Sequence, residues 1–476
     1  MLIPFILLAA TLFALLLTFY SRACRLPTGA QWPPGPSAWP IIGHLHLLGP
    51  LPHQSLCKLS HTYGPLMGLR LGGVPTIVAS TAEMAKEILQ THDLAFANHP
   101  RSAAGLHMQL DADMVTTPYG GTFRNMRQIC SSELLNAKRL ASFRHVREEE
   151  VRNLVRAVLQ AGSRGEAKVE LRPYLRVTTN DIICRMMMGK KMEDVSSESG
   201  RGKIELLKLA VGRHIQAILQ DLIDKRWRQA ERNPNMGKDF LDVLLDASDQ
   251  DTISDDNVRG LILDVFTAGS HTSAATIEWV LAELINNPAS MHKVQEELEN
   301  VVGKLRFVKE EDLESLPYLQ MVIKESMRLH PMGPLLLPHE SFRECQIQNY
   351  KIPTQTRAFV NVWAIGRDPS TWENPLMFWP ERFDINEVDF RDSTFKLLAF
   401  SSGRRGCPGW NLGLLTTQLI VATLNQGFTW TIGLPTNQNL GLYNQQVDMS
   451  ESYDLVLDLA KPLNLFATPM LPLHIY

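Results

Sequence analysis

The chain has 476 residues, of which 45% are hydrophobic and 20% charged, so it is globular and has ample material for a large core. A formal net charge of -3 at pH 7 gives no reason to expect nucleic acid as a partner, because that binding draws its affinity from clustered Lys and Arg. The six cysteines form no CxxC pair, which argues against a structural zinc site or a disulfide framework and favours free thiols in a reducing compartment.

The N-terminus begins with an apolar run, residues 2–20, of about the length needed to cross the hydrocarbon core of a bilayer. Ser21, Arg22 and Arg25 follow this run, and no charged residue precedes it. A cleaved signal peptide has a basic start and a shorter apolar core, so we expect a retained membrane anchor over residues 1–25, with a cleaved signal as the alternative. The positive-inside tendency then places the rest of the chain in the cytosol.

A proline-rich segment, residues 26–52, follows the expected anchor. Its prolines fix backbone angles and exclude helix, which predicts a stiff, extended linker that would orient the body against the membrane. The alternative is a plain surface linker. From residue 53 to residue 476 no repeat and no low-complexity run interrupts the chain, so one large domain, 53–476, is predicted.

The first predicted elements of the body are a hairpin and a capped helix. Two short β-prone runs separated by Gly and Pro lie in GPLMGLRLGGVPTIVAS, residues 64–80, and predict the hairpin. The segment 81–93 has helical spacing and begins with Thr81, a suitable N-cap. Helical periodicity then covers most of the middle of the chain, in the segments 125–135, 144–161, 178–188, 203–228 and 238–247.

The longest predicted helix begins after Ser254, whose side chain can cap it, and ends at Asn287, just before a proline. The positive end of the helix dipole stabilises the two aspartates in its first turn. A second clear helix, 317–330, starts with proline and stops before the next proline. The hexapeptide AGSHTS, residues 268–273, lies near the midpoint of the longest helix.

The strongest local motif is FSSGRRGCPG, residues 400–409. A cysteine that binds a metal as thiolate needs a lowered pKa and backbone N–H groups directed at its sulfur. Glycines on both sides of Cys407, among them Gly403 and Gly409, allow the loop to fold tightly enough to provide them. Arg405 can pair with a carboxylate of the same cofactor.

This loop has the pattern FxxGxRxCxG, and on it the sequence resembles the cytochrome P450 family over nearly its whole length. Two further motifs agree. KESMR carries Glu325 and Arg328, which would share one helix face, and FWPERF carries Arg382, which would complete a three-membered ion network around the core that holds the thiolate loop. The resemblance implies a mainly α fold with small β-sheets, one haem-thiolate domain behind an N-terminal transmembrane helix.

The resemblance implies haem b as cofactor, with the Cys407 thiolate as the iron ligand, and thiolate donation favours O–O cleavage. The two haem propionates need cationic partners, for which Arg405, Arg127 and His339 are the candidates. The other cofactor-binding residues implied by the motif are Phe400, Gly403 and Gly409. Phe123 stands where the family usually has Trp, which removes an indole N–H donor.

The AGSHTS hexapeptide resembles the family motif A/G-G-x-D/E-T-T/S, which lies across the oxygen-binding face of the haem. Ala268 and Gly269 match the small positions, and Thr272 matches the alcohol that helps to deliver protons. His271 replaces the usual acid. Three interpretations stay open: a proton relay with altered pH dependence, a structural histidine beside another water chain, and iron ligation, which is disfavoured because the family's acid points away from the iron.

Among plant members, the motifs look most like the microsomal group of flavone synthase and isoflavone synthase and, more distantly, flavonoid hydroxylases. The resemblance implies an enzyme of the endoplasmic reticulum membrane whose catalytic domain faces the cytosol. It would receive electrons from NADPH through an NADPH-cytochrome P450 reductase, use O2, and hydroxylate or desaturate a small lipophilic flavonoid, phenylpropanoid or terpenoid. The residues expected to face this substrate are Met114, Val115, Val265, Ala268, Leu336, Leu337 and Tyr453.

The region 193–237 is shorter than in the family, so that the roof of the substrate pocket and part of the contact with membrane lipid would be missing. Either the pocket is unusually open or the sequence reflects an imperfect gene model. Two alternative functions follow from these departures. The lost acid suggests a reductase-independent isomerase or dehydratase, and the short region suggests a non-catalytic haem protein.

Overall fold

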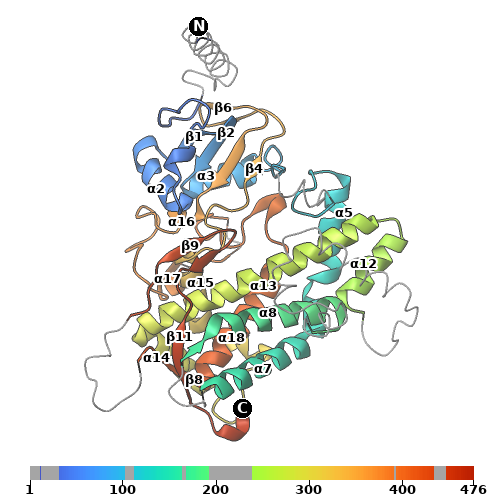
Figure 1. Cartoon of the computed structure of the whole chain (residues 1–476), viewed down its shortest axis with the longest axis vertical. Helices are drawn as coiled ribbons and strands as arrows, with labels where there is room; N and C mark the ends of the chain where they lie inside the picture. The colour runs from blue at the N-terminus through green and yellow to red at the C-terminus, as the bar shows by residue number, and fades with distance from the viewer. Residues whose placement is uncertain are drawn as a thin grey trace, which may run out of the picture. The chain divides into compact units, whose positions relative to one another are not determined.

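The computed structural model describes residue 11 and residues 32–101, 112–162, 168–191, 238–386, 388–390, 393–433 and 446–476. The expected anchor, apart from residue 11, the helix predicted at 203–228 and the shortened region 193–237 lie outside these residues. Within the described ranges, no helix combines the length and the apolar character needed to cross a membrane. The described residues form many helices and a few small sheets, as the resemblance implies (Figure 1).

The chain divides into two compact units. Unit 1 comprises Met1–Pro100, Gly333–Leu376 and Val388–Gly406. Unit 2 comprises Arg101–Met332, Met377–Glu387 and Cys407–Tyr476. The predicted single domain over 53–476 stays a prediction.

Unit 1 is built around a four-stranded sheet of order β1-β2-β7-β4. The predicted hairpin is confirmed, because β1 and β2 pair antiparallel, whereas β2 and β7 pair parallel. The hydroxyl of Thr81 accepts a hydrogen bond of 3.4 Å from the backbone N–H of Met84, as expected of an N-cap. The elements of this unit are α2 (Pro52–Tyr63), β1 (Leu66–Leu71), β2 (Val74–Ala79), α3 (Ala82–Lys86), a π-helical turn (Glu87–Thr91), β4 (His339–Glu340), β5 (Cys345–Ile347), β6 (Tyr350–Ile352), β7 (Arg357–Val360) and α16 (Val362–Ile365).

Unit 2 holds the long helices, with α7, α8 and α13 side by side (Figure 1). Its helices are α5 (Gly121–Ile129), α6 (Ala137–Ser142), α7 (Arg144–Gly162), α8 (Leu171–Met188), α12 (Phe240–Asp249), α13 (Asp255–Asn286), α14 (Pro288–Val301), α15 (Pro317–Leu329), α17 (Arg382–Asn386) and α18 (Trp410–Gly427). Its strands are β3 (Val169–Glu170), β8 (Phe428–Thr431) and β11 (Asn464–Pro469) in one sheet, and β9 (Glu451–Tyr453) with β10 (Leu457–Leu459) in a hairpin. Helix α13 packs against both α8 and α18.

The boundaries of α13 follow from its caps. Ser254 and Asn257 form a reciprocal capping box, each side chain accepting a bond from the other residue's backbone N–H at 3.2 Å. Pro288 then begins α14, so the predicted bounds of the long helix are confirmed. The predicted start of α8 at residue 178 is wrong, because the helix begins at Leu171, where Pro173 is tolerated in the first turn.

Candidate functional site

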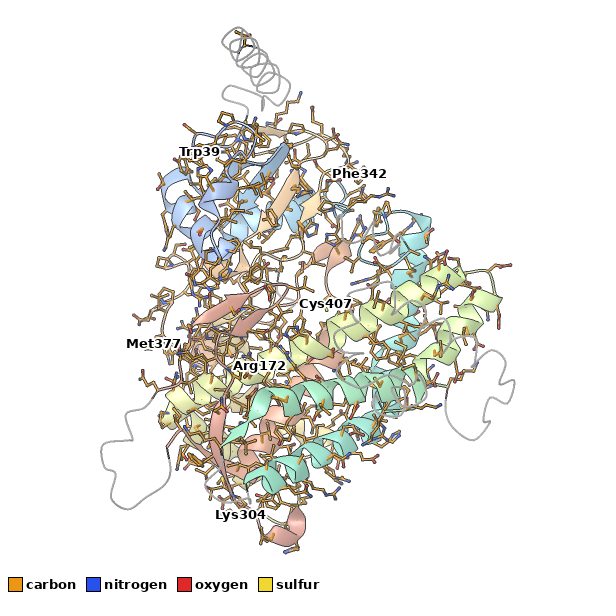
Figure 2. The ribbon with its side chains drawn as sticks, in the orientation of Figure 1. Trp39, Arg172, Lys304, Phe342, Met377 and Cys407 are labelled. Atoms are coloured by element: carbon orange, nitrogen blue, oxygen red, sulfur yellow. The ribbon has the colours of Figure 1, made fainter. Side chains whose placement is uncertain are left out.

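Cys407 lies three residues before α18 in unit 2, and its side chain is open to solvent on one side. The surrounding protein raises the pKa of the thiol by burial, while a hydrogen bond from the backbone N–H of Gly409 and the charge of Arg127 act in the opposite direction. Figure 2 labels Cys407. A backbone N–H and a nearby cation are the features that stabilise a thiolate, so this cysteine is equipped to bind a soft metal ion.

The preceding residues of the motif, 400–406, belong to unit 1. Gly403 has φ of +72°, and a Cβ there would lie 2.4 Å from the carbonyl oxygen of Leu89, so only glycine fits. Arg405 donates from Nε to the carbonyl oxygen of Ala97 at 2.6 Å. Phe400 packs edge-on against Phe390, with ring centroids 5.3 Å apart. The backbone contacts of Gly403 and Arg405 thus fix this part of the loop.

Gly409 differs from Gly403, although both belong to the motif. A Cβ on Gly409 would meet no heavy atom within 4 Å, and its φ is -89°. No described protein atom therefore excludes a side chain at this position. Its role lies in the backbone N–H that faces the sulfur of Cys407.

His339 of β4 lies in unit 1 beside a second histidine, His99, with ring centroids 5.1 Å apart. The Nδ1 of His339 donates to the carbonyl oxygen of Phe96 at 2.8 Å, and the Nδ1 of His99 donates to that of Pro338 at 2.7 Å. Burial lowers the pKa of His339 to about 4, and the charge of Arg405 acts in the same direction. Burial likewise lowers the pKa of His99 to about 3, so both rings are neutral.

His99 was not identified from the sequence. Its bonded partner Pro338 is 239 residues away along the chain, and the residues next to His99 carry no local signal of such a contact. The structure therefore adds His99 to the group formed by His339 and Arg405.

The AGSHTS segment forms an open stretch in the middle of α13. Residues 261–263 and 273–284 of this helix are buried, whereas Ala268 is exposed. A Cβ on Gly269 would lie 2.8 Å from Cδ1 of Ile183, so this glycine permits the close packing of α13 against α8. Thr272 donates its hydroxyl proton to the carbonyl oxygen of Ala268 at 2.5 Å, which leaves its lone pairs free to accept.

His271 is directed toward the β9–β10 hairpin. Its Nε2 lies 2.9 Å from one carboxylate oxygen of Asp458 and 3.2 Å from the other, and 3.0 Å from Nη2 of Arg176. Burial raises the pKa of Asp458, but the hydrogen bond with His271 and the charges of Arg172 and Arg176 outweigh it and hold that pKa below its usual value. The sequence did not reveal Asp458, which lies 187 residues from His271.

Glu325, Arg328 and Arg382 meet in the interior of unit 2, each at most 1% exposed. Arg328 donates to both carboxylate oxygens of Glu325 at 2.7 Å, and Arg382 donates to one of them at 3.0 Å. Both arginines also donate to the carbonyl oxygen of Met377 at 3.2 Å. The network therefore ties α15 to the start of α17.

The residues expected to face a substrate are distributed over both units. Unit 2 holds Met114, Val115, Val265, Ala268 and Tyr453, and unit 1 holds Leu336 and Leu337. The backbone N–H of Met114 donates to a carboxylate oxygen of Asp264 on α13 at 2.7 Å, and Val265 packs against the same hydrophobic cluster as Met114. Burial and the neighbouring Asp113 raise the pKa of Asp264 well above its usual value, so this carboxyl group, which the sequence did not reveal, tends to stay protonated.

The family model and the similar proteins reported below all point to one family. The family model for Cytochrome P450 matches residues 33–211 and 203–447. The chain is 41% identical to Cytochrome P450 93A3 of Glycine max, over 90% of this chain and 91% of that protein. It is 36% identical to Flavonoid 3'-monooxygenase of Petunia hybrida, over 99% of each chain, and 37% identical to 3,9-dihydroxypterocarpan 6A-monooxygenase of Glycine max, over 90% and 92%.

A solved structure of a zebra fish cytochrome P450 with abiraterone superposes with a TM-score of 0.74 and 25% identity, covering 89% of this chain and 100% of that one. The alignment with the Petunia hybrida protein spans 519 positions, 43 more than the 476 residues of this chain. The relative therefore has residues in its interior that this chain lacks.

Proposed function

The chain belongs to the cytochrome P450 family of monooxygenases, and from that premise we propose that it oxidises a flavonoid or a related plant phenolic, either by hydroxylation or by desaturation. The observation that supports this substrate class most directly is the similarity to flavonoid 3'-monooxygenases of Petunia hybrida and Arabidopsis thaliana, at 36% and 38% identity over 99% of this chain. A further relative, at 37% identity, is named for a pterocarpan substrate. Terpenoids are the second substrate class to test.

In this proposal Cys407 holds the iron of haem b through its thiolate. Burial raises the pKa of the Cys407 thiol in the protein alone, but the Gly409 N–H and the Arg127 charge support the assignment, because both favour the ionised form that ligates a metal. When bound, haem supplies dioxygen activation, for which thiolate donation favours O–O cleavage. Phe400 and Gly403 shape the loop that precedes the ligand.

The haem propionates are bound by Arg405, Arg127 and His339 in this proposal. Arg405 and Arg127 carry permanent charges, whereas His339 is neutral in the protein alone because burial lowers its pKa to about 4. An anionic carboxylate near its Nε2 would favour protonation of the ring, so that both nitrogens could donate. Glu325, Arg328 and Arg382 contribute indirectly, by holding the core of unit 2 in register.

Thr272 is proposed as the residue that presents an alcohol to the oxygen-activating stretch of α13. Its hydroxyl proton is donated to the carbonyl oxygen of Ala268. The lone pairs of the hydroxyl oxygen can therefore accept a hydrogen bond from a water molecule or another O–H group. His271 is the neighbouring ionisable group. Its Nε2 is already bonded to Asp458 or Arg176, which supports a role in proton supply or positioning and disfavours iron ligation.

The proposed arrangement in the cell is an N-terminal anchor over 1–25, a linker over 26–52 and a catalytic domain over 53–476 on the cytosolic face of the endoplasmic reticulum. The apolar run 2–20 with arginines behind it supports this arrangement. Electrons come from NADPH through an NADPH-cytochrome P450 reductase, and membrane lipid surrounds the anchor. The substrate lies among Met114, Val115, Val265, Ala268, Leu336, Leu337 and Tyr453.

The test is turnover by the full-length protein in membranes that also contain a plant reductase. Flavanones, flavones and terpenoids are supplied with NADPH and isotopically labelled dioxygen, and products are identified by mass spectrometry. We expect an NADPH-dependent product, either with one labelled oxygen atom or with a new double bond, and none from Cys407→Ala. Product formed without NADPH would overturn the proposal in favour of an isomerase or dehydratase. A protein that binds haem but turns over no substrate would favour a non-catalytic role.

A further inference from the structure

Three charged or ionisable side chains from three elements of unit 2 meet at one atom. His271 comes from α13, Asp458 from β10 and Arg176 from α8. The Nε2 of His271 lies 2.9 Å from Oδ2 of Asp458 and 3.0 Å from Nη2 of Arg176, while Arg176 and Asp458 are themselves 3.5 Å apart. The cluster borders the open stretch of α13, because His271 directly precedes Thr272.

The two contacts of Nε2 exclude one another. A protonated Nε2 donates to the carboxylate of Asp458, whereas an unprotonated Nε2 accepts from the guanidinium of Arg176, which never loses its proton. A change of protonation therefore exchanges the partner of His271 without any movement of the backbone. Among the described residues, Arg172 of α8 and Glu278 of α13 also act on Asp458 through their charges, and they are paired with each other at 2.8 Å.

The backbone on both sides of Asp458 is held by bonds that do not involve His271. On one side of it, the carbonyl oxygen of Leu457 accepts from Nε1 of Trp279 at 2.8 Å. On the other side, the carbonyl oxygen of Leu459 accepts from Nη2 of Arg172 at 2.6 Å, and Figure 2 labels Arg172. Strand β10 is thus held to α13 and α8 by its backbone on both sides of the aspartate. The strand that carries the carboxylate is therefore anchored without the histidine.

The same hairpin carries Tyr453, whose Cα is the register partner of Leu457. We infer that Asp458 and Arg176 are positioning residues for His271, which they hold beside Thr272 in one of two hydrogen-bonded states. In this arrangement Asp458 provides, from β10, the carboxylate that the open stretch of α13 around Thr272 lacks. This inference rests on the proposed monooxygenase function. It assigns the pH dependence of coupling between NADPH oxidation and product formation to the pair His271 and Asp458.

The test compares Asp458→Asn with Asp458→Glu and with Asp454→Asn, a matched control at an exposed aspartate of the same hairpin. Product formed per NADPH is measured against pH in the membrane-bound holoenzyme. We expect Asp458→Asn to keep the reduced carbon monoxide spectrum and to form about tenfold less product per NADPH. Loss of a direct proton-transfer group costs about a hundredfold or more, and the effect is smaller here because Asp458 acts through His271. Its pH profile should match that of His271→Asn, Asp458→Glu should restore the profile, and Asp454→Asn should leave it unchanged.

A double-mutant cycle gives a second readout that needs no turnover. The thermal unfolding of the holoenzyme is measured for His271→Asn, Asp458→Asn and the double variant at about pH 5.5 and about pH 8.5, on either side of the usual imidazole range. We expect a coupling between the two sites that is larger at the lower pH. Additive effects at both pH values, or a pH profile of Asp458→Asn equal to that of the wild type, would overturn the inference while leaving the monooxygenase proposal intact.

Discussion

Glu325 and Arg328 form a bidentate ion pair with no exposed surface, in which two guanidinium nitrogens each lie 2.7 Å from a carboxylate oxygen. Arg382 shares the same carboxylate at 3.0 Å. Removing one member of such a buried network leaves the others charged and unpaired, which costs far more than the intact pair contributes.

Glu325→Gln should therefore destabilise the protein by about 3–5 kcal/mol, with loss of bound haem. Chemical denaturation and haem content measure the two effects. The control is Glu299→Gln, which breaks an exposed pair with Lys304 and should cost about 0–1 kcal/mol. Equal stability of both variants would show that the Glu325 network does not hold this core.

The two motif glycines provide a matched pair of substitutions. Gly403→Ala places a Cβ 2.4 Å from the carbonyl oxygen of Leu89 at a φ of +72°, so the loop must shift, at a cost of at least about 1–2 kcal/mol. Gly409→Ala meets no atom within 4 Å and should be tolerated. Haem content and thermal unfolding of the two variants check this. Equal loss in both would mean that steric fit does not explain the glycine at position 403.

Arg127 should support the thiolate of Cys407 through its charge. Arg127→Leu removes that charge, so the pKa of the thiol rises further and haem binding should weaken severalfold. The reduced carbon monoxide spectrum should then contain a larger fraction of the form without a thiolate ligand. Arg124→Leu, at an exposed position of the same helix, is the control and should bind haem as the wild type does. Unchanged haem affinity in Arg127→Leu would contradict this assignment.

The haem-free protein should lose stability as pH falls, partly because of His339. Its pKa is about 4 in the folded protein and 6.5 as a free side chain, so the unfolded chain binds the proton more readily. Its contribution is intact above about pH 6.5 and is lost as pH decreases toward 4, at a slope of at most about 1.4 kcal/mol per pH unit. Denaturation of His339→Asn should show a weaker pH dependence in this range. An unchanged slope would mean that His339 is not neutral in the folded state.

For His271→Asp, the structure and the sequence alone lead to different expected results. The family motif has an acid at this position, so the sequence suggests that the substitution preserves coupling. In the structure, the new carboxylate would share this site with the carboxylate of Asp458, which now bonds the imidazole, and two carboxylates in one site repel. We expect His271→Asp to couple less well than His271→Asn at neutral pH and to recover when combined with Asp458→Asn. Full coupling in His271→Asp alone would contradict this.

Local signals predicted much of the fold. The capping box at Ser254, the proline at the start of α15 and the Gly-Pro punctuation around β1 and β2 act over a few residues, so the sequence reveals them directly. The start of α8 was missed because its first turn contains a proline, which local rules treat as a helix boundary although the first turn tolerates it.

The cysteine loop was identifiable because the chemistry of a thiolate ligand requires several fixed residues within ten positions. Asp458 and His99 were not, since their contacts join residues 187 and 239 positions apart and depend on tertiary packing. Asp264 escaped notice for the same reason, because its raised pKa reflects burial and the approach of Asp113. Residues that only the fold brings together can be recognised as partners only from the three-dimensional structure.

The proposed function depends above all on Cys407 binding haem iron as a thiolate. The most direct measurement is the reduced carbon monoxide difference spectrum of the wild type, of Cys407→Ala and of the control Cys345→Ala, recorded on membranes with equal amounts of protein. We expect thiolate-ligated absorbance in the wild type and in Cys345→Ala, and none in Cys407→Ala. Persistence of that absorbance in Cys407→Ala would contradict it.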